Sequence, residues 1–285
     1  LNNTDAFVNA SVSAPTSSVF SVDGNSNAST THIAYCWSEV AGFSKFGSYS
    51  GTGSAVTVTT GFKPRYILVR STSSGRDWLV WDAARGPSGG ALQPNTSNTA
   101  YSDSTYNGIS FNSDGFTIMT GGSTPNMSAA GETYIYAAFA DRPGNNWDVN
   151  NLVAEAAGLS TANQGFNAVT YSGNSGTQSI SSLNFQPDFV WIKNRNGGHN
   201  HMLFDVVRGA GADLQSNSTA SEGAAGSNDL TSFDSNGFSL GSNNAVNQSG
   251  RTYVGWAWKA GGAAVSNTDG TIASQVSANT TYGFS

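Results

Sequence analysis

The stretch Asn184-Phe-Gln-Pro-Asp-Phe-Val-Trp-Ile-Lys193 repeats the pattern of Gly61-Phe-Lys-Pro-Arg-Tyr-Ile-Leu-Val-Arg70, and this pair of segments decides the fold. In each segment a proline precedes a near-continuous apolar run, which is typical of a strand covered on both faces. Just before a strand, the missing N–H of proline costs no hydrogen bond in the sheet. The offset is 123 residues (187 − 64), so the chain carries two copies of one large unit rather than a short solenoid repeat.

Two further motifs keep this register. Asp82-Ala-Ala-Arg-Gly86 is matched by Asp205-Val-Val-Arg-Gly209, and Phe111-Asn-Ser-Asp-Gly-Phe116 is matched by Phe233-Asp-Ser-Asn-Gly-Phe238. Because each unit is long enough to hold its own core, we expect an array of domains. The predicted ranges are 1–40 for the C-terminal part of a truncated unit, 41–143 for the first repeat, 144–262 for the second repeat, and 263–285 for a linker and the start of a further unit.

The ends of the sequence extend the pattern. Thr31–Trp37 aligns with the runs that close the two repeats, Thr133–Phe139 and Thr252–Trp258. Residues 270–285 resemble the run that leads into Phe166. We therefore expect that the sequence starts and ends within a unit.

Composition limits the partners of this chain. Of its 285 residues 11% are charged and 11% are aromatic, and enough aromatic surface is present to build a core. The net charge of −6 disfavours binding to nucleic acid or anionic lipid, and no apolar run is long enough to span a bilayer. Cys36 is the only cysteine, so no intrachain disulfide can form. Ala138 and Ala257 align with it, which indicates a small buried side chain rather than a reactive thiol.

Short apolar runs bounded by turn residues predict an all-β fold of tandem antiparallel, jelly-roll-like β-sandwich domains, with partial repeat units at both ends. Trp78–Trp81 and His201–Phe204 should pair with the apolar runs that precede them. In the closing run of the second repeat, Trp256 and Trp258 fall on one face, where we expect them to fill the layer between the two sheets.

Connections between the repeats contain little sign of regular structure. We expect linkers near residues 141–151 and 260–270. Helix evidence is confined to Asn151–Ala157, which is long enough for two turns at most.

The recurrent Asp-x-x-Arg-Gly is the most conspicuous charged feature. It could be half of an acid/base pair or a sugar-binding pair, but paired-carboxylate hydrolysis needs a second acid that also recurs. Glu132 has no acidic counterpart in the second repeat, and Asp77 corresponds to Asn200. We therefore interpret the motif as a structural ion pair at a strand end. The predicted pairs are Asp82 with Arg85 and Asp205 with Arg208.

Other candidate sites are weaker. His199 and His201 would share one face of a strand, as a metal site requires, but the first repeat has no histidine there and no third ligand recurs. We interpret both as surface or loop residues, and we predict no catalytic residue, metal or cofactor. Exposed aromatic side chains could stack on sugar rings. The tryptophan candidates are Trp78, Trp81, Trp147 and Trp191.

An ordered set of motifs carries a family resemblance. These are Phe185–Arg195, Leu203–Gly209, Ser232–Gly241 and Trp256–Gly262, together with the opening Tyr35–Gly47. They resemble a tandem domain of virion proteins from tailed phages of marine bacteria and cyanobacteria. The resemblance implies a structural role on the virion exterior, as a tail fibre, appendage or capsid decoration. It implies other virion proteins and further copies of the chain as partners, with a trimer as the expected homo-oligomer, and it transfers no catalytic residues.

The function expected from these observations is non-enzymatic, with a contribution to attachment to host cell-surface glycans. Linked units gain avidity when several engage together, which suits weak recognition of sugars. Two alternatives stay open. One is a component of a polysaccharide depolymerase, which needs carboxylates about 5–10 Å apart in a groove. The other is a module of a bacterial extracellular adhesin.

Overall fold

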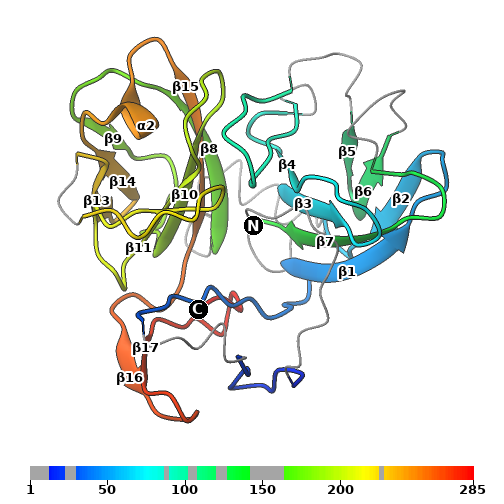
Figure 1. Ribbon diagram of the computed structural model, residues 1–285, viewed down its shortest axis with the longest axis horizontal. Helices are drawn as coiled ribbons and strands as arrows, with labels where there is room; N and C mark the ends of the chain where they lie inside the picture. The colour runs from blue at the N-terminus through cyan, green and yellow to red at the C-terminus, as the bar shows by residue number, and fades with distance from the viewer. Residues whose placement is uncertain are drawn as a thin grey trace, which may run out of the picture.

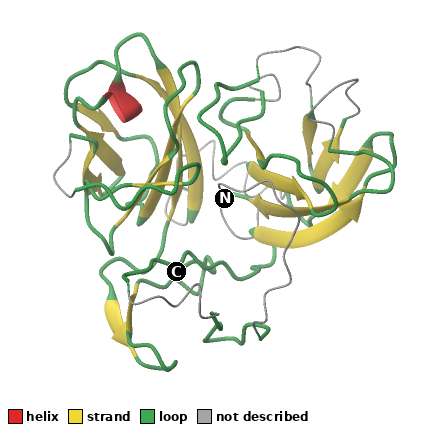
Figure 2. Cartoon of the chain, viewed as in Figure 1, coloured by secondary structure: helices red, strands yellow, loops and turns green. Residues whose placement is uncertain are grey.

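A computed structural model describes residues 13–22, 30–86, 90–101, 108–119, 127–141, 164–224 and 228–285. Within these ranges the chain is all-β, and its one helix is the single turn α2 (Asn244–Asn247) (Figure 2). The described ranges include no helix that is long and apolar enough to cross a membrane. The predicted fold class, a tandem antiparallel β-sandwich, is confirmed.

The first repeat contains two antiparallel sheets. Its strands are β1 (Ser44–Ser50), β2 (Val56–Thr59), β3 (Tyr66–Ser71), β4 (Leu79–Asp82), β5 (Ile109–Asn112), β6 (Gly115–Ile118) and β7 (Thr133–Phe139). The larger sheet has the order β1-β7-β3-β4, and the smaller has the order β2-β6-β5. Phe116 of the smaller sheet contacts Tyr49 and Tyr136 of the larger one, so the space between the sheets is filled by aromatic rings.

The second repeat has the same topology, strand for strand. Its strands are β8 (Phe166–Ser172), β9 (Gln178–Ile180), β10 (Phe189–Asn194), β11 (Met202–Asp205), β12 (Leu214–Gln215), β13 (Leu230–Asp234), β14 (Gly237–Leu240) and β15 (Thr252–Trp258). The larger sheet has the order β8-β15-β10-β11-β12, and the smaller has the order β9-β14-β13. The short β12 corresponds to an isolated bridge in the first repeat, between Val80 and Leu92. The duplication seen in the sequence is therefore a duplication of the fold.

The predicted hairpins are confirmed. β3 pairs with β4 in a register that aligns Tyr66 with Asp82, and β10 pairs with β11 in a register that aligns Phe189 with Asp205. Ser113-Asp114 turns the chain between β5 and β6, and Ser235-Asn236 does the same between β13 and β14, with a glycine as the first residue of each following strand.

The larger sheet of each repeat lies toward the centre of the molecule, and the smaller sheets lie on the outside (Figure 1). Tyr66 of β3 lies 5.6 Å from Phe166 and 5.5 Å from Trp258 of the second repeat, measured between ring centroids. One hydrophobic core therefore runs from the first repeat into the contact between the repeats. We call this contact, formed around Tyr66, Phe166, Trp256 and Trp258, the joint. A second core lies within the second repeat.

This packing corrects the expected place of the tryptophans in β15. Trp256 and Trp258 do share a face, but that face packs against the first repeat. Tyr253 and Ala257, on the opposite face, belong to the core between the sheets of the second repeat. Both faces of β15 are buried, one against the first repeat and one inside the second sandwich, so alternation along the strand does not by itself show which side the tryptophans take.

The N-terminal run is only partly a strand. Thr31–Trp37 aligns in sequence with the closing strands β7 and β15, whereas in the structure this run forms an isolated bridge, between Trp37 and Phe284. Cys36 and Ser285 exchange both backbone hydrogen bonds, at 2.8 and 3.0 Å. In the second repeat the closing strand β15 is held by neighbours on both sides, and the described residues place a partner on one side only of the N-terminal run. Cys36 itself is half-buried rather than buried.

The expected linker at 260–270 contains regular structure instead. β16 (Val265–Asn267) pairs with β17 (Ser274–Val276) in a hairpin that projects from the body of the molecule (Figure 1). The helix expected at Asn151–Ala157 lies outside the described residues, as does all of the linker expected at 141–151 except Asp141.

Candidate functional site

The Asp-x-x-Arg-Gly motif forms the same buried turn in both repeats, directly after β4 and β11. Arg85 donates through Nε to Oδ2 of Asp82 at 2.6 Å, and Arg208 donates to Oδ2 of Asp205 at the same distance. The pair in the first repeat is almost fully enclosed, with side chains 1% and 0% exposed. In each turn the backbone N–H of the arginine also donates to Oδ1 of the aspartate.

The arginine binds the neighbouring backbone as well as the aspartate. Arg85 donates to the carbonyl oxygens of Val80 and Gly90 at 3.1 and 2.7 Å. Arg208 makes the corresponding bonds, to Leu203 and Ala212. A planar guanidinium with several donors can satisfy all these acceptors at once, which explains why arginine recurs here.

Glycine closes the motif because the chain turns through the left-handed region there. The φ angle is 71° at Gly86 and 93° at Gly209. Other residues adopt such angles at a cost, so the sequence pattern follows from the backbone of the turn.

Each turn receives a hydrogen bond from an aromatic side chain outside its own repeat. The indole N–H of Trp256 donates to Oδ2 of Asp82 at 2.9 Å. The hydroxyl of Tyr35 donates to Oδ2 of Asp205 at 2.7 Å. Trp256 and Tyr35 are equivalent, since each lies two residues before the tryptophan that ends its run, Trp258 or Trp37. Burial, followed by the charge of Asp205, raises the pKa of Tyr35, so its hydroxyl keeps the proton that it donates.

Aromatic packing around these hydrogen bonds is also duplicated. Tyr66 of the first repeat lies 5.7 Å from Trp256, and its counterpart Phe189 lies 4.4 Å from Tyr35. Phe189 also contacts Phe284, as Tyr66 contacts Phe166. The joint between the two repeats and the joint between the second repeat and the terminal segments therefore have the same construction.

Three equivalent aromatic residues meet where the joints converge. Trp37, Phe139 and Trp258 each end a closing run, and their ring centroids lie 5.8 to 6.3 Å apart in all three pairs. The three rings come from the N-terminal run, the first repeat and the second repeat, so all three segments meet at this point.

A polar contact beside the joint connects residues 93–101 of the first repeat to the second. The ammonium of Lys193 donates to the carbonyl oxygen of Ser97 at 3.1 Å and to two carbonyl oxygens of its own repeat, those of Asn194 and His199. The Ala100 N–H donates to the carbonyl oxygen of Arg195 at 2.9 Å. Burial lowers the pKa of Lys193 to about 8. The side chain of Lys193 thus bridges the two repeats through hydrogen bonds, while burial disfavours its charged form.

An amide network fixes the loops on either side of this contact. In the first repeat Asn95 donates to Asp77 at 2.7 Å and accepts from the Trp78 N–H. In the second repeat Asn217 donates to Asn200 at 2.8 Å and accepts from the N–H of His201. Both asparagines are in Asn-x-Ser/Thr sequences, but their side chains are used inside the fold.

His199 and His201 have separate hydrogen-bond partners. His201 lies in the loop directly before β11, but it is fully buried rather than at the surface, and its Nδ1 accepts a hydrogen bond from the indole of Trp191 at 2.8 Å. His199 contacts Gln248 instead, at 3.2 Å. Burial and the nearby charge of Lys193 lower the pKa of His201. In the described part of the chain, no three His, Cys, Asp or Glu side chains are grouped so as to hold a metal ion.

The tryptophan candidates are mostly core residues. Trp81 and Trp191 are 3% and 4% exposed. Trp78 is half-buried beneath the guanidinium of Arg70, 5.2 Å from its ring centroid. Trp147 lies outside the described residues.

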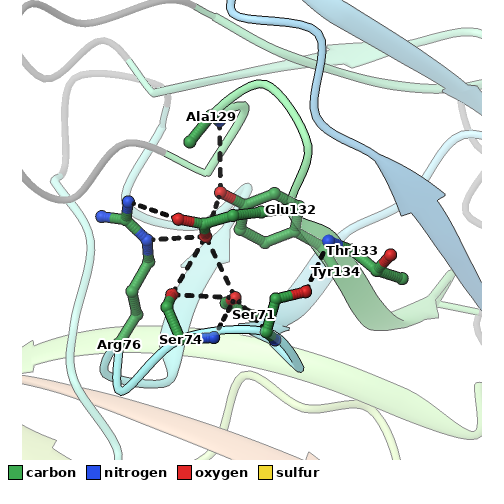
Figure 3. Close-up of polar contacts among 8 residues, drawn as sticks. Ser71, Ser74, Arg76, Ala129, Glu132, Thr133 and Tyr134 are labelled. Carbon is green, nitrogen blue, oxygen red and sulfur yellow. Dashed lines mark hydrogen bonds and ion pairs between the residues drawn. The ribbon is translucent and has the colours of Figure 1, made fainter.

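Glu132 forms a polar cluster that is particular to the first repeat. Figure 3 shows its carboxylate between Arg76, Ser74, Ser71 and the hydroxyl of Tyr134. Arg76 binds both carboxylate oxygens at 2.8 Å, and this ion pair lowers the pKa of Glu132 to about 2. A carboxylate held in this way stays ionised near neutral pH, so it is not suited to deliver a proton.

The sequence did not indicate the roles of three residues of the joint, Tyr35, Trp256 and Lys193. Tyr35 and Trp256 align in the closing runs, but their hydrogen-bond partners are 170 and 174 positions away. One signal could have found them: both closing runs carry an aromatic side chain with an N–H or O–H at this position, and the Asp-x-x-Arg turns also occur twice. Lys193 closes an apolar run, and nothing in that pattern indicates that its side chain is buried.

A family model described as "Domain of unknown function (DUF7483)" matches residues 1–143 and 161–285 of this chain. The search of curated proteins found no match. The search of solved structures also found none.

Proposed function

The chain belongs to the family described as a domain of unknown function (DUF7483), and we propose that it is a structural protein of a tailed-phage virion. It would form part of an external fibre, appendage or capsid decoration and contribute to attachment to host-surface glycans. Its partners would be other virion proteins and further copies of itself.

The joint is the observation that carries this proposal. The charged motif that the two repeats share connects each repeat to a neighbouring segment. Asp82 binds Trp256 and Asp205 binds Tyr35. A shared hydrophobic core accompanies these bonds. Interfaces of this kind favour a stiff body in which repeats are added in a fixed geometry, as a mechanical component of a particle requires.

The use of the carboxylates supports a non-enzymatic role. Asp82 and Asp205 are each bound by an arginine and an aromatic donor, and Glu132 is bound by Arg76. Polysaccharide hydrolysis by paired carboxylates needs one acid that holds its proton near neutral pH and faces the substrate. The low pKa of Glu132 is the opposite of that requirement.

Attachment to glycans follows from the tandem design rather than from a single deep site. Several weak contacts on one stiff body bind a polymeric surface better than one contact does. We therefore expect binding to host envelope polysaccharide to be weak for one chain and stronger for chains displayed in multiple copies.

Antibodies raised against the full chain test the proposal on intact particles by immunogold electron microscopy. Labelling on the outside of purified virions is the expected result. Labelling confined to the surface of uninfected bacteria would contradict it and favour the adhesin alternative.

A second assay tests the enzymatic alternative. The full chain is incubated with host envelope polysaccharide, and new reducing ends are measured. We expect no release above that of a heat-denatured control, while a glycan array should retain the folded chain. Sustained release of reducing ends would overturn the non-enzymatic assignment.

A further inference from the structure

Two joints in this molecule share one arrangement of side chains. In both, Oδ2 of the aspartate in an Asp-x-x-Arg turn accepts a hydrogen bond from an aromatic side chain two residues before the end of a closing run. In both, an aromatic residue of the turn's own repeat, Tyr66 or Phe189, packs on that donor. A geometry that occurs twice with different residues is a property of the unit and not an accident of one contact.

We propose that this arrangement is a directional latch through which units of this fold recognise one another. The receptor is the Asp-x-x-Arg turn of one unit, Asp82 or Asp205. The ligand is an indole or phenol donor on the closing run of a neighbouring unit: Trp256 of the second repeat for Asp82, and Tyr35 of the terminal segments for Asp205. The inference does not depend on the virion role.

Chemistry of the donor sets the specificity of the latch. Each aspartate already binds an arginine through the same oxygen, at 2.6 Å, so the latch adds a neutral donor to a charge-assisted pair. Tryptophan and tyrosine carry an N–H or O–H at the end of a flat ring, and both reach the turn. Phenylalanine would fill the same space without a donor and would leave the buried carboxylate with one hydrogen bond fewer.

The latch has a direction because the first repeat lacks a donor at the position equivalent to Trp256 and Tyr35. Ala137 lies two residues before Phe139 at the end of β7, where it has neither ring nor donor. The first repeat can therefore present a receptor to the unit that follows it, but it cannot act as ligand in this hydrogen bond. The partner that fits the receptor is a unit of this fold with tryptophan or tyrosine at the second position before the end of its closing run.

Hydrogen exchange measured by mass spectrometry on the full chain tests the latch. The variant Trp256→Phe, in the second repeat, should raise the exchange of residues 79–86 in the first repeat by about tenfold or more, because a hydrogen bond to a buried carboxylate is lost. The matched control is Tyr171→Phe. It removes a hydroxyl hydrogen bond of 2.8 Å to the carbonyl oxygen of Val246, beside the core that lies within the second repeat, so it should leave residues 79–86 unchanged.

A conservative variant separates the latch from simple loss of packing. Trp256→Tyr restores a donor of the type used at the second joint, and we expect it to return the exchange of residues 79–86 most of the way to that of the native chain. If Trp256→Tyr raises exchange as much as Trp256→Phe, or if neither variant raises it, the latch is wrong. Should Trp256→Phe fail to fold, recovery of folding by Trp256→Tyr supports the latch, and failure of both overturns it.

The second joint gives an independent test. Tyr35→Phe removes one hydroxyl and keeps the ring, and it should raise the exchange of residues 202–209. Unchanged exchange there would show that the hydrogen bond to Asp205 does not hold the turn, and the proposed equivalence of the two joints would fail.

Discussion

The indole N–H of Trp256 donates a hydrogen bond of 2.9 Å to Oδ2 of Asp82, 174 positions earlier in the chain. This bond joins the closing strand of the second repeat to the charged turn of the first. The turn is therefore both a local structure, formed by residues 80–90, and part of the contact between two repeats. Its roles can be separated by substitution.

Removing the charge of Asp82 should lower the unfolding free energy substantially. Asp82→Asn breaks a fully enclosed ion pair, and breaking a buried pair by removing one charge costs about 3–5 kcal/mol of unfolding free energy. Asp205→Asn is the matched change. It should cost less, because the side chains of Arg208 and Asp205 are more exposed, at 10% and 4%. Urea denaturation of the two variants checks the order, and an equal or reversed loss would contradict it.

Glu132 should make stability depend on acid pH. Its folded pKa of about 2 lies below the ordinary value of 4.5, so the folded state prefers the ionised form. The contribution is present above pH 4.5 and disappears as pH falls through 2. Glu132→Gln should therefore lower the unfolding free energy by about 1–2 kcal/mol at pH 7 and by little at pH 2.

Glu39 supplies the control for that experiment. It also pairs with a lysine, Lys45, but both side chains are largely exposed. Exposed pairs contribute little because water screens them. Urea denaturation of Glu39→Gln should show a much smaller change at pH 7, and a loss equal to that of Glu132→Gln would contradict the importance of the enclosed cluster.

Lys193 should make stability depend on alkaline pH. Its folded pKa of about 8 lies below the ordinary value of 10.5, so the unfolded chain binds more protons between these values. Stability from this group therefore rises with pH across that window. Between pH 8 and pH 9.5 the gain should be about 2 kcal/mol for one lysine.

Two variants isolate this effect. Lys193→Met has no charge, and Lys193→Arg stays charged throughout, as does Arg70 at the corresponding position of the first repeat. In both, the rise in unfolding free energy between pH 8 and pH 9.5 should disappear, as measured by denaturant titration. A rise that persists in both variants would assign it to another group.

The terminal segments should be open to covalent closure. Cys36 and Ser285 form a hydrogen-bonded antiparallel pair, in which Cα atoms are typically about 5.5 Å apart. That spacing is within reach of a disulfide. Ser285→Cys should therefore form a bond to Cys36 under mild oxidation and raise stability by about 2 kcal/mol or more.

Peptide mapping under non-reducing conditions detects that bond. Cys36→Ser combined with Ser285→Cys is the control, since it keeps the new thiol and removes its partner. If the single variant remains reduced while its thiols react freely with a labelling reagent, the two segments are not paired as described.

Much of the fold was predictable because it rests on local signals. Proline followed by an apolar run marked β3 and β10, and Asp-Gly or Asn-Gly marked the turns into β6 and β14. Such signals depend on the preferences of a few neighbouring residues, so they are visible in any single copy. The second copy then doubled the support for each.

The candidate site was predictable in part only. The sequence marks Asp82 and Arg85 as partners, because they are three residues apart in a turn. It does not indicate that the carboxylate has a third partner, because the donor comes from a distant strand. His201 shows the same limit, since a polar residue beside a loop was expected near the surface and is in fact enclosed by the second repeat and the joint.

By itself the sequence determines that this protein is a duplicated, all-β chain, because repetition and the alternation of apolar residues are properties of the order of residues. Only the tertiary structure decides that one face of the larger sheet of the second repeat packs against the first repeat. Alternation in β15 shows that its two faces differ, but each face could have met the sandwich interior or the neighbouring repeat. The choice depends on the space between whole sheets, and it places Trp256 and Trp258 in the joint and Tyr253 and Ala257 in the sandwich.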